Sequence, residues 1–112
     1  VRAKEKEEAD RLINDAKALE KAGCFALVLE KIPSDLASLV AKELTIPIIG
    51  IGAGNKVDGQ VLVVHDMLGI NNEFNPRFLR KYNNLHKEMK ESFQKYIDDV
   101  KSNDFPNESE QY

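Results

Sequence analysis

The stretch FALVLEKIP at residues 25–33 decides the fold that this sequence predicts. Its first five residues are all apolar, which is typical of a parallel strand covered on both faces. Glu30 follows directly and Pro33 comes three residues later, so we expect a strand over residues 24–30 with the carboxylate at its carboxyl end. In α/β folds, ligands bind and catalysis occurs at that edge of the sheet. Glu30 is therefore the main functional candidate.

Two roles are open for Glu30 from its position alone. A carboxylate at the mouth of an apolar strand is partly desolvated, which suits a general base that removes a proton next to a carbonyl group. Alternatively, Glu30 is a surface residue that pairs with Lys31 or with the helix that follows.

Hydrophobic spacing and turn residues predict the elements around this strand. A helix is expected over about residues 4–22, with Gly23 after its end, where positive φ suits glycine. Ser34 is the predicted N-cap of a second helix, which residues 45–47 end because a residue before proline leaves the α region. Cys24 opens the first strand as a small buried hydrophobe.

Two further strands are expected at residues 46–51 and 61–64. The connection between them is too short for the crossover helix that a parallel pair normally has. Asn75 and Pro76 form a predicted N-cap and N1 pair for a long amphipathic helix that runs to about Val100. A break at residues 83–84 is possible, and residues 102–112 are expected to be an extended polar tail.

The element order indicates an α/β fold, and residues 1–112 are predicted to form a single incomplete domain. Three strands that are apolar on both faces need cover on both faces, and the predicted helices could cover only one face well. Closing a barrel takes about eight strands. We therefore expect the missing strands to lie upstream.

Composition restricts the possible partners. The chain has 112 residues, of which 31% are charged, and a formal net charge of −3. This mixed, slightly acidic character predicts no nucleic-acid or membrane partner. No apolar run approaches the roughly 18–20 residues of a membrane span. The single cysteine fits a reducing compartment, so we expect a cytoplasmic protein.

Two other motifs are candidate sites. The glycines at residues 50, 52 and 54 do not follow the GxGxxG register of a phosphate-binding loop. We therefore expect a sharp turn that lets a ligand or a strand approach closely, rather than a phosphate-binding site. His65 and Asp66 are expected at the end of the third strand, where His65 would donate to a carboxylate or carbonyl. With no HExxH or CxxC motif, no metal site is expected within the chain.

Three motifs together resemble the ketopantoate hydroxymethyltransferase (3-methyl-2-oxobutanoate hydroxymethyltransferase) family. They are LVLE-x-IP at residues 27–33, IPIIGIGAG at 46–54, and DGQVLVVHD at 58–66 followed by Gly69. The likeness runs from the first predicted helix to residues 104–106, and it covers only the C-terminal portion of the family's enzyme, with its last three strands.

The resemblance implies the C-terminal part of a (β/α)8 TIM barrel of the phosphoenolpyruvate-binding type. It implies transfer of a hydroxymethyl group from 5,10-methylenetetrahydrofolate to 3-methyl-2-oxobutanoate, giving 2-dehydropantoate for pantothenate biosynthesis. The family's catalytic carboxylate falls on Glu30. A Mg²⁺ ion is expected to bind the 2-oxo acid through ligands from earlier strands, whereas the folate-binding residues are unknown.

The implied partners are a 2-oxo acid, a folate, the remainder of the same barrel, and further copies in a homo-oligomer. The chain alone is expected to be inactive. Two alternatives stay open: a related phosphoenolpyruvate or isocitrate lyase or mutase, and a non-catalytic assembly fragment whose long helix makes oligomer contacts.

Overall fold

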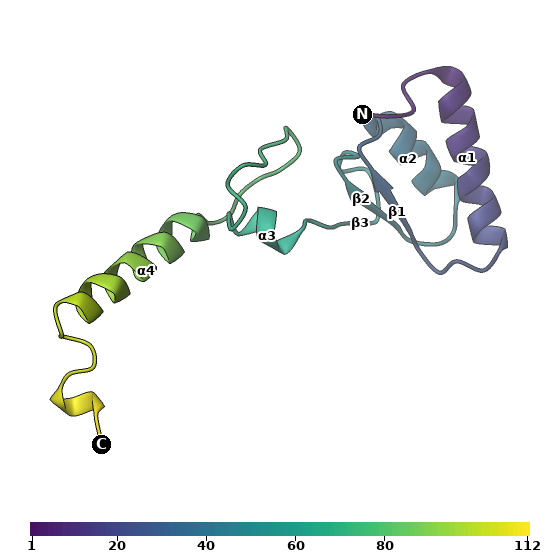
Figure 1. Ribbon diagram of the computed structural model, residues 1–112. Coiled ribbons are helices and arrows are strands. Elements are labelled where there is room, and N and C mark those ends of the chain that lie inside the picture. The colour runs from purple at the N-terminus through teal and green to yellow at the C-terminus, as the bar shows by residue number, and fades with distance from the viewer. The chain divides into compact units, whose positions relative to one another are not determined.

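A computed structural model describes residues 1–112, which divide into two compact units, Val1–Leu62 and Val63–Tyr112. The first unit holds a three-stranded parallel sheet with the order β1-β2-β3 and two helices (Figure 1). Its elements are α1 (Lys6–Lys21), β1 (Leu27–Glu30), α2 (Ser34–Glu43), β2 (Ile48–Ile51) and β3 (Gly59–Gln60). The predicted α/β class is therefore confirmed, and the small parallel sheet is consistent with part of a barrel.

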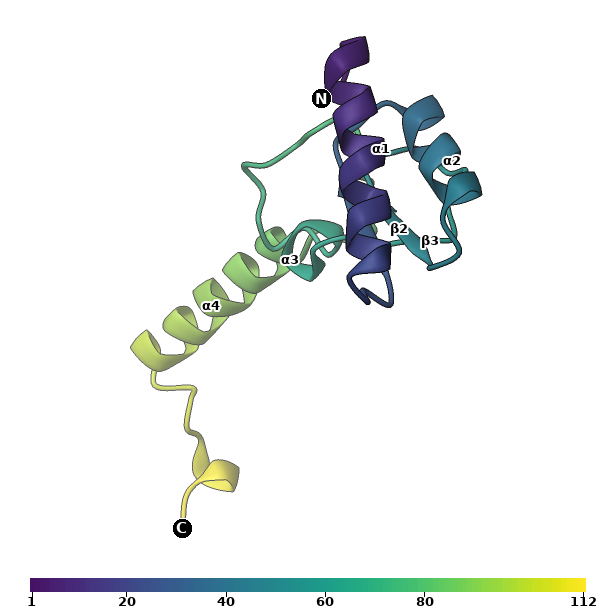
Figure 2. The same cartoon turned by 90° about the vertical axis from the view of Figure 1, so that its right-hand side faces the viewer.

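Both helices cover the same face of the sheet (Figures 1 and 2). Leu29 and Ile48 are buried on that face and pack in one core cluster with Leu36 and Val40 of α2. Val28 lies on the opposite face and is 61% exposed. Successive strand residues point to opposite faces, so this alternation shows a sheet that is covered on one side only.

The end of α1 follows the sequence prediction. Gly23 has φ +103°, and the amide of Cys24 donates to the Leu19 carbonyl, which gives the helix a glycine C-terminal motif. The strand starts later than predicted, at Leu27, because the Leu27 amide makes the first ladder bond, to the Pro47 carbonyl. Cys24 is therefore half-buried in the connection and does not open the strand.

The predicted third strand at residues 61–64 is wrong. Pairing with β2 begins earlier, because the Asp58 amide donates to the Ile48 carbonyl and the Ile48 amide donates to the Asp58 carboxylate at 2.8 Å. The hydrogen bond from the Val61 amide to the Gly50 carbonyl is the last one between these two segments along the chain. The parallel pair thus forms without a crossover helix, and β3 has only two residues.

The second unit contains α3 (Val64–Met67), α4 (Leu85–Lys101) and a 3-10 turn, η1 (Glu108–Glu110). The long helix predicted from Asn75 and Pro76 begins only at Leu85. The amides of Tyr82, Leu85 and His86 donate to carbonyls of residues 67–69 rather than within a helix. Gly69, at φ +68°, allows this contact, because a Cβ there would collide with the Asn83 carbonyl.

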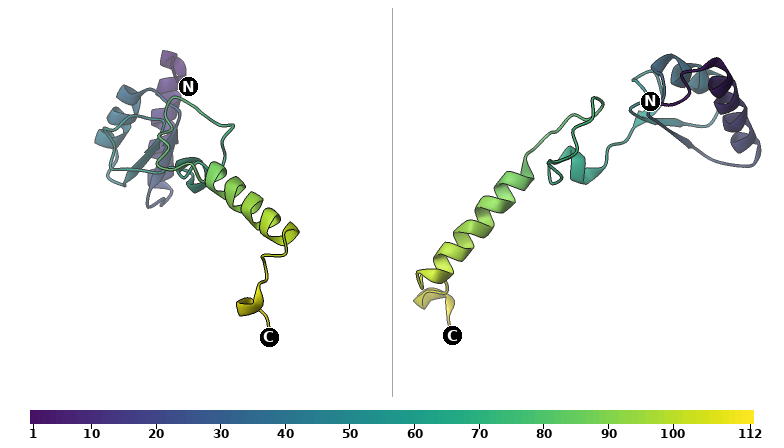
Figure 3. Two further views of the ribbon diagram at one scale, coloured as in Figure 1. Left: turned by 90° about the vertical axis from the view of Figure 1, so that its left-hand side faces the viewer. Right: turned by 45° about the horizontal axis from the view of Figure 1, so that its top comes forward.

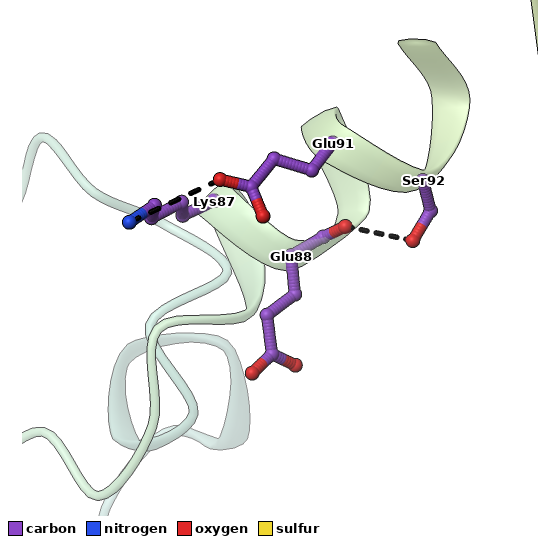
Figure 4. Close-up of polar contacts among 4 residues, drawn as sticks. All are labelled: Lys87, Glu88, Glu91 and Ser92. Carbon is purple, nitrogen blue, oxygen red and sulfur yellow. Dashed lines mark hydrogen bonds and ion pairs between the residues drawn. The ribbon is translucent and has the colours of Figure 1, made fainter. Parts of the chain in front are cut away.

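α4 is one continuous, largely exposed helix (Figure 3). On its polar side Lys87 pairs with Glu91 at 3.9 Å, and the Ser92 hydroxyl donates to the Glu88 carbonyl (Figure 4). Its apolar side carries Phe93 and Tyr96, and the Tyr96 ring meets the Phe105 ring edge-on at 5.6 Å. No helix in the chain has both the length and the apolar character to cross a membrane.

Candidate active site

Glu30 is the last residue of β1, as predicted, and it pairs in register with Ile51, the last residue of β2. The Lys31 amide donates to the Ile51 carbonyl at 2.9 Å and closes this end of the ladder. Residues paired across neighbouring strands point to the same face. Because Leu29 and Gly50 lie on the helix-covered face, Glu30 and Ile51 lie on the other face, together with Val28 and Ile49. We call this surface the open face.

The Glu30 side chain is exposed. The residues of this chain alone therefore do not give its carboxylate the partial desolvation that the sequence predicted. A cavity of about 440 Å³ runs beside β1 and includes Glu30, Arg2, Arg11 and Asp15 in its lining. Arg2 is held there by its backbone, since its amide donates to the Lys31 carbonyl at 2.8 Å. Glu30 is thus reachable both from the open face and from the free edge of the sheet.

The glycine turn after β2 is sharp, as predicted, but the close neighbour is a helix rather than the ligand or strand that the sequence predicted. Gly52 and Gly54 have φ values of +65° and +82°. A Cβ on Gly54 would lie 2.5 Å from the Cβ of Ser34, the first residue of α2, so only glycine fits. The Gln60 amide group donates to the Gly54 carbonyl at 2.8 Å. These contacts fix the chain immediately beyond Ile51.

His65 and Asp66 do not follow a strand. Both lie in α3 of the second unit, and His65 is exposed. The His65 carbonyl accepts from the amides of Ile70 and Asn71, while the Asp66 carboxylate accepts from the Asn71 side chain at 3.5 Å. The sequence placed these residues with Glu30 at one sheet edge, and that prediction loses its basis because residues 61–63 are not a strand.

Sequence reasoning missed two carboxylates that hold the first unit together. Glu20 accepts from the amides of Thr45 and Ile46, at 2.7 and 3.1 Å, and ties the end of α1 to the segment before β2. Those hydrogen bonds lower the pKa of Glu20. The Asp58 carboxylate likewise accepts from a backbone amide, that of Ile48, and so ties the start of β3 to β2. Neither carries a sequence signal, because each bonds a backbone more than nine residues away.

The acidic and metal-binding side chains of this chain are dispersed. No three or more His, Cys, Asp or Glu side chains come together in a way that could hold a metal ion. Magnesium requires several oxygen ligands in near-octahedral geometry. The residues of this chain therefore do not fit the ion.

The fold and the position of Glu30 define a parallel α/β protein with a carboxylate at the carboxyl edge of its sheet. The ketopantoate hydroxymethyltransferase family model matches residues 1–108, and the chain belongs to this family. Over all 112 residues the chain is 68% identical to a Christiangramia forsetii protein and 69% identical to one from Parabacteroides distasonis. A Flavobacterium johnsoniae protein is 67% identical over the same length.

All three relatives are named 3-methyl-2-oxobutanoate hydroxymethyltransferase. This chain spans 41% of the length of each. The family match separates the transferase from the lyase and mutase alternatives that the sequence left open.

Proposed function

We propose that this chain is the part of a hydroxymethyltransferase that supplies the catalytic base. The reaction joins a one-carbon unit from 5,10-methylenetetrahydrofolate to C3 of 3-methyl-2-oxobutanoate, giving 2-dehydropantoate. The single observation that carries the proposal is the position of Glu30, at the carboxyl end of β1 and on the open face. The open face would line the inside of a (β/α)8 barrel, and Glu30 would lie at the C-terminal end of that barrel, where TIM-barrel enzymes have their active sites.

In this reaction the Glu30 carboxylate removes the proton from C3 of the oxo acid. The electrons of the C–H bond form the C2–C3 double bond of an enolate, with the charge on the 2-oxo oxygen. C3 then bonds to the one-carbon unit and water supplies the new hydroxyl group, while the two bonds between that carbon and the folate nitrogens break and their electrons stay on nitrogen. The proton from C3 and one proton from water end on the two folate nitrogens. Magnesium, as a Lewis acid, would bind through residues outside these 112.

The test uses a full-length chimera in which these 112 residues replace the matching segment of the Christiangramia forsetii protein. The readout is exchange of the C3 proton of 3-methyl-2-oxobutanoate with deuterated solvent, with magnesium and without folate, so that enolisation is measured alone. Glu30→Gln keeps the shape and an acceptor oxygen but cannot take a proton. Losing a positioned base should slow exchange about 10²–10⁴-fold while leaving binding of the oxo acid nearly intact.

Glu43→Gln is the matched control, because it makes the same substitution away from the carboxyl end of β1. Glu43 is the last residue of α2 and pairs with Lys17 at 2.9 Å. That pair is partly exposed and should affect stability by at most about 1 kcal/mol, with no effect on exchange. If Glu30→Gln exchanges the proton at the rate of the unsubstituted chimera, Glu30 is not the base.

A further inference from the structure

Ile51 is the apolar neighbour of Glu30 on the open face. The two residues are paired in register and each ends its strand, and neighbouring strands lie about 4.8 Å apart. Gly52 turns the chain directly after Ile51, at φ +65°. Ile51 itself is half-buried and outside the core cluster that the helices cover, so its side chain is available to a ligand on the open face.

The proposed chemistry restricts what surrounds the carboxylate. A base must approach within hydrogen-bonding distance of the proton that it removes. In 3-methyl-2-oxobutanoate the carbon that bears this proton also bears two methyl groups, so these groups must lie within a few ångströms of the Glu30 oxygens. Methyl groups there need an apolar contact, because polar groups facing them would lose their partners.

Within this chain, Ile51 is the side chain placed to give that contact. Val28 and Ile49 share the open face but pair with each other two residues further from the edge. The branched Ile51 side chain has few rotamers and therefore forms a wall of defined shape. Resting on the proposed function, we infer that Ile51 contacts the branch at C3 of the substrate and sets the size of the alkyl group that the site accepts.

The test measures a preference between two substrates in the full-length chimera. Ile51→Ala removes most of the wall, so 3-methyl-2-oxopentanoate, with an ethyl group in place of one methyl, should fit the vacated space. The ratio of kcat/KM for this acid to that for 3-methyl-2-oxobutanoate should rise about tenfold or more, within the 10–200-fold range of one methylene in an apolar pocket. Ile51→Val should move the ratio in the same direction by less, and it serves if the alanine variant does not fold.

Ile49→Ala is the matched control. Ile49 is the same residue type as Ile51 and lies on the same strand and face, but it pairs with Val28 rather than with Glu30. This variant should lower stability and leave the substrate ratio unchanged, because a ratio does not depend on the folded fraction. An unchanged ratio in both Ile51 variants, or an equal change in Ile49→Ala, would overturn the inference.

Failure of the proposed function is seen separately, as absence of C3 proton exchange in the unsubstituted chimera. The ratio of dissociation constants for the two acids, from calorimetry with magnesium present, needs no turnover. The ratio of dissociation constants therefore tests the inference even if the chimera shows no exchange. An unchanged ratio in both Ile51 variants, or an equal change in Ile49→Ala, would again overturn it.

Discussion

Substituting Gly54 by alanine should destabilise the first unit through two effects that can be separated. The residue has φ +82°, a left-handed conformation that costs an L-residue about 1–2 kcal/mol. The new Cβ would also lie 2.5 Å from the Cβ and 3.2 Å from the Cα of Ser34. Overpacking of this kind costs about 1–3 kcal/mol, so the free energy of unfolding should fall by roughly 2–5 kcal/mol in total.

Gly23→Ala isolates the conformational part. Gly23 has φ +103°, and a Cβ there would meet nothing within 4 Å, so this variant should lose only about 1–2 kcal/mol. Ser34→Gly removes the Cβ, the nearer of the two atoms that the Gly54→Ala methyl group would strike. The double variant should therefore regain about 1–3 kcal/mol relative to the sum of the single variants.

The assay is urea denaturation of the full-length chimera, followed by circular dichroism, for the four variants and the parent. A Gly54→Ala loss no larger than the Gly23→Ala loss would refute the packing argument. So would a double variant whose loss is simply the sum of its parts.

Two further predictions concern stability and association. The hydrogen bonds from Thr45 and Ile46 lower the pKa of Glu20, so their stabilisation is present above about pH 4.3, the usual value for a free Glu, and is lost as pH falls through the lowered value. Thermal melts from pH 3 to pH 7 should show this acid loss in the parent and a flatter profile in Glu20→Gln; parallel profiles would contradict it. The isolated chain should self-associate, because Val28 and Phe93 are each 61% exposed, and a compact monomer in sedimentation would contradict this.

Much of the first unit could be predicted because its signals are local. Gly23 marks the end of α1, and the apolar run before Glu30 marks β1, since both depend on residues next to each other in the sequence. The two errors share a physical cause. Asp58 draws β3 to an earlier register, and carbonyls of residues 67–69 take the amides that would have begun the long helix. These bonds join segments that a hydrophobic pattern does not relate.

The candidate site was predictable in position but not in surroundings. The strand end placed Glu30 at the carboxyl edge of the sheet, whereas its pairing with Ile51 depends on the register of two strands that α2 separates. His65 was placed at the same edge only because a third strand was assumed to reach it.

The face that carries Glu30 is also the face that the helices of the first unit leave without cover. Val28 and Ile51 on it are apolar, and a carboxylate beside them acts as a strong base only when water is excluded. The same event, the packing of further chain onto the open face, would therefore bury its apolar side chains and desolvate Glu30. If Glu30 is the base, as we propose, folding and catalysis are coupled at this surface, and a substitution that weakens its cover should lower the exchange rate even where it touches neither Glu30 nor the substrate.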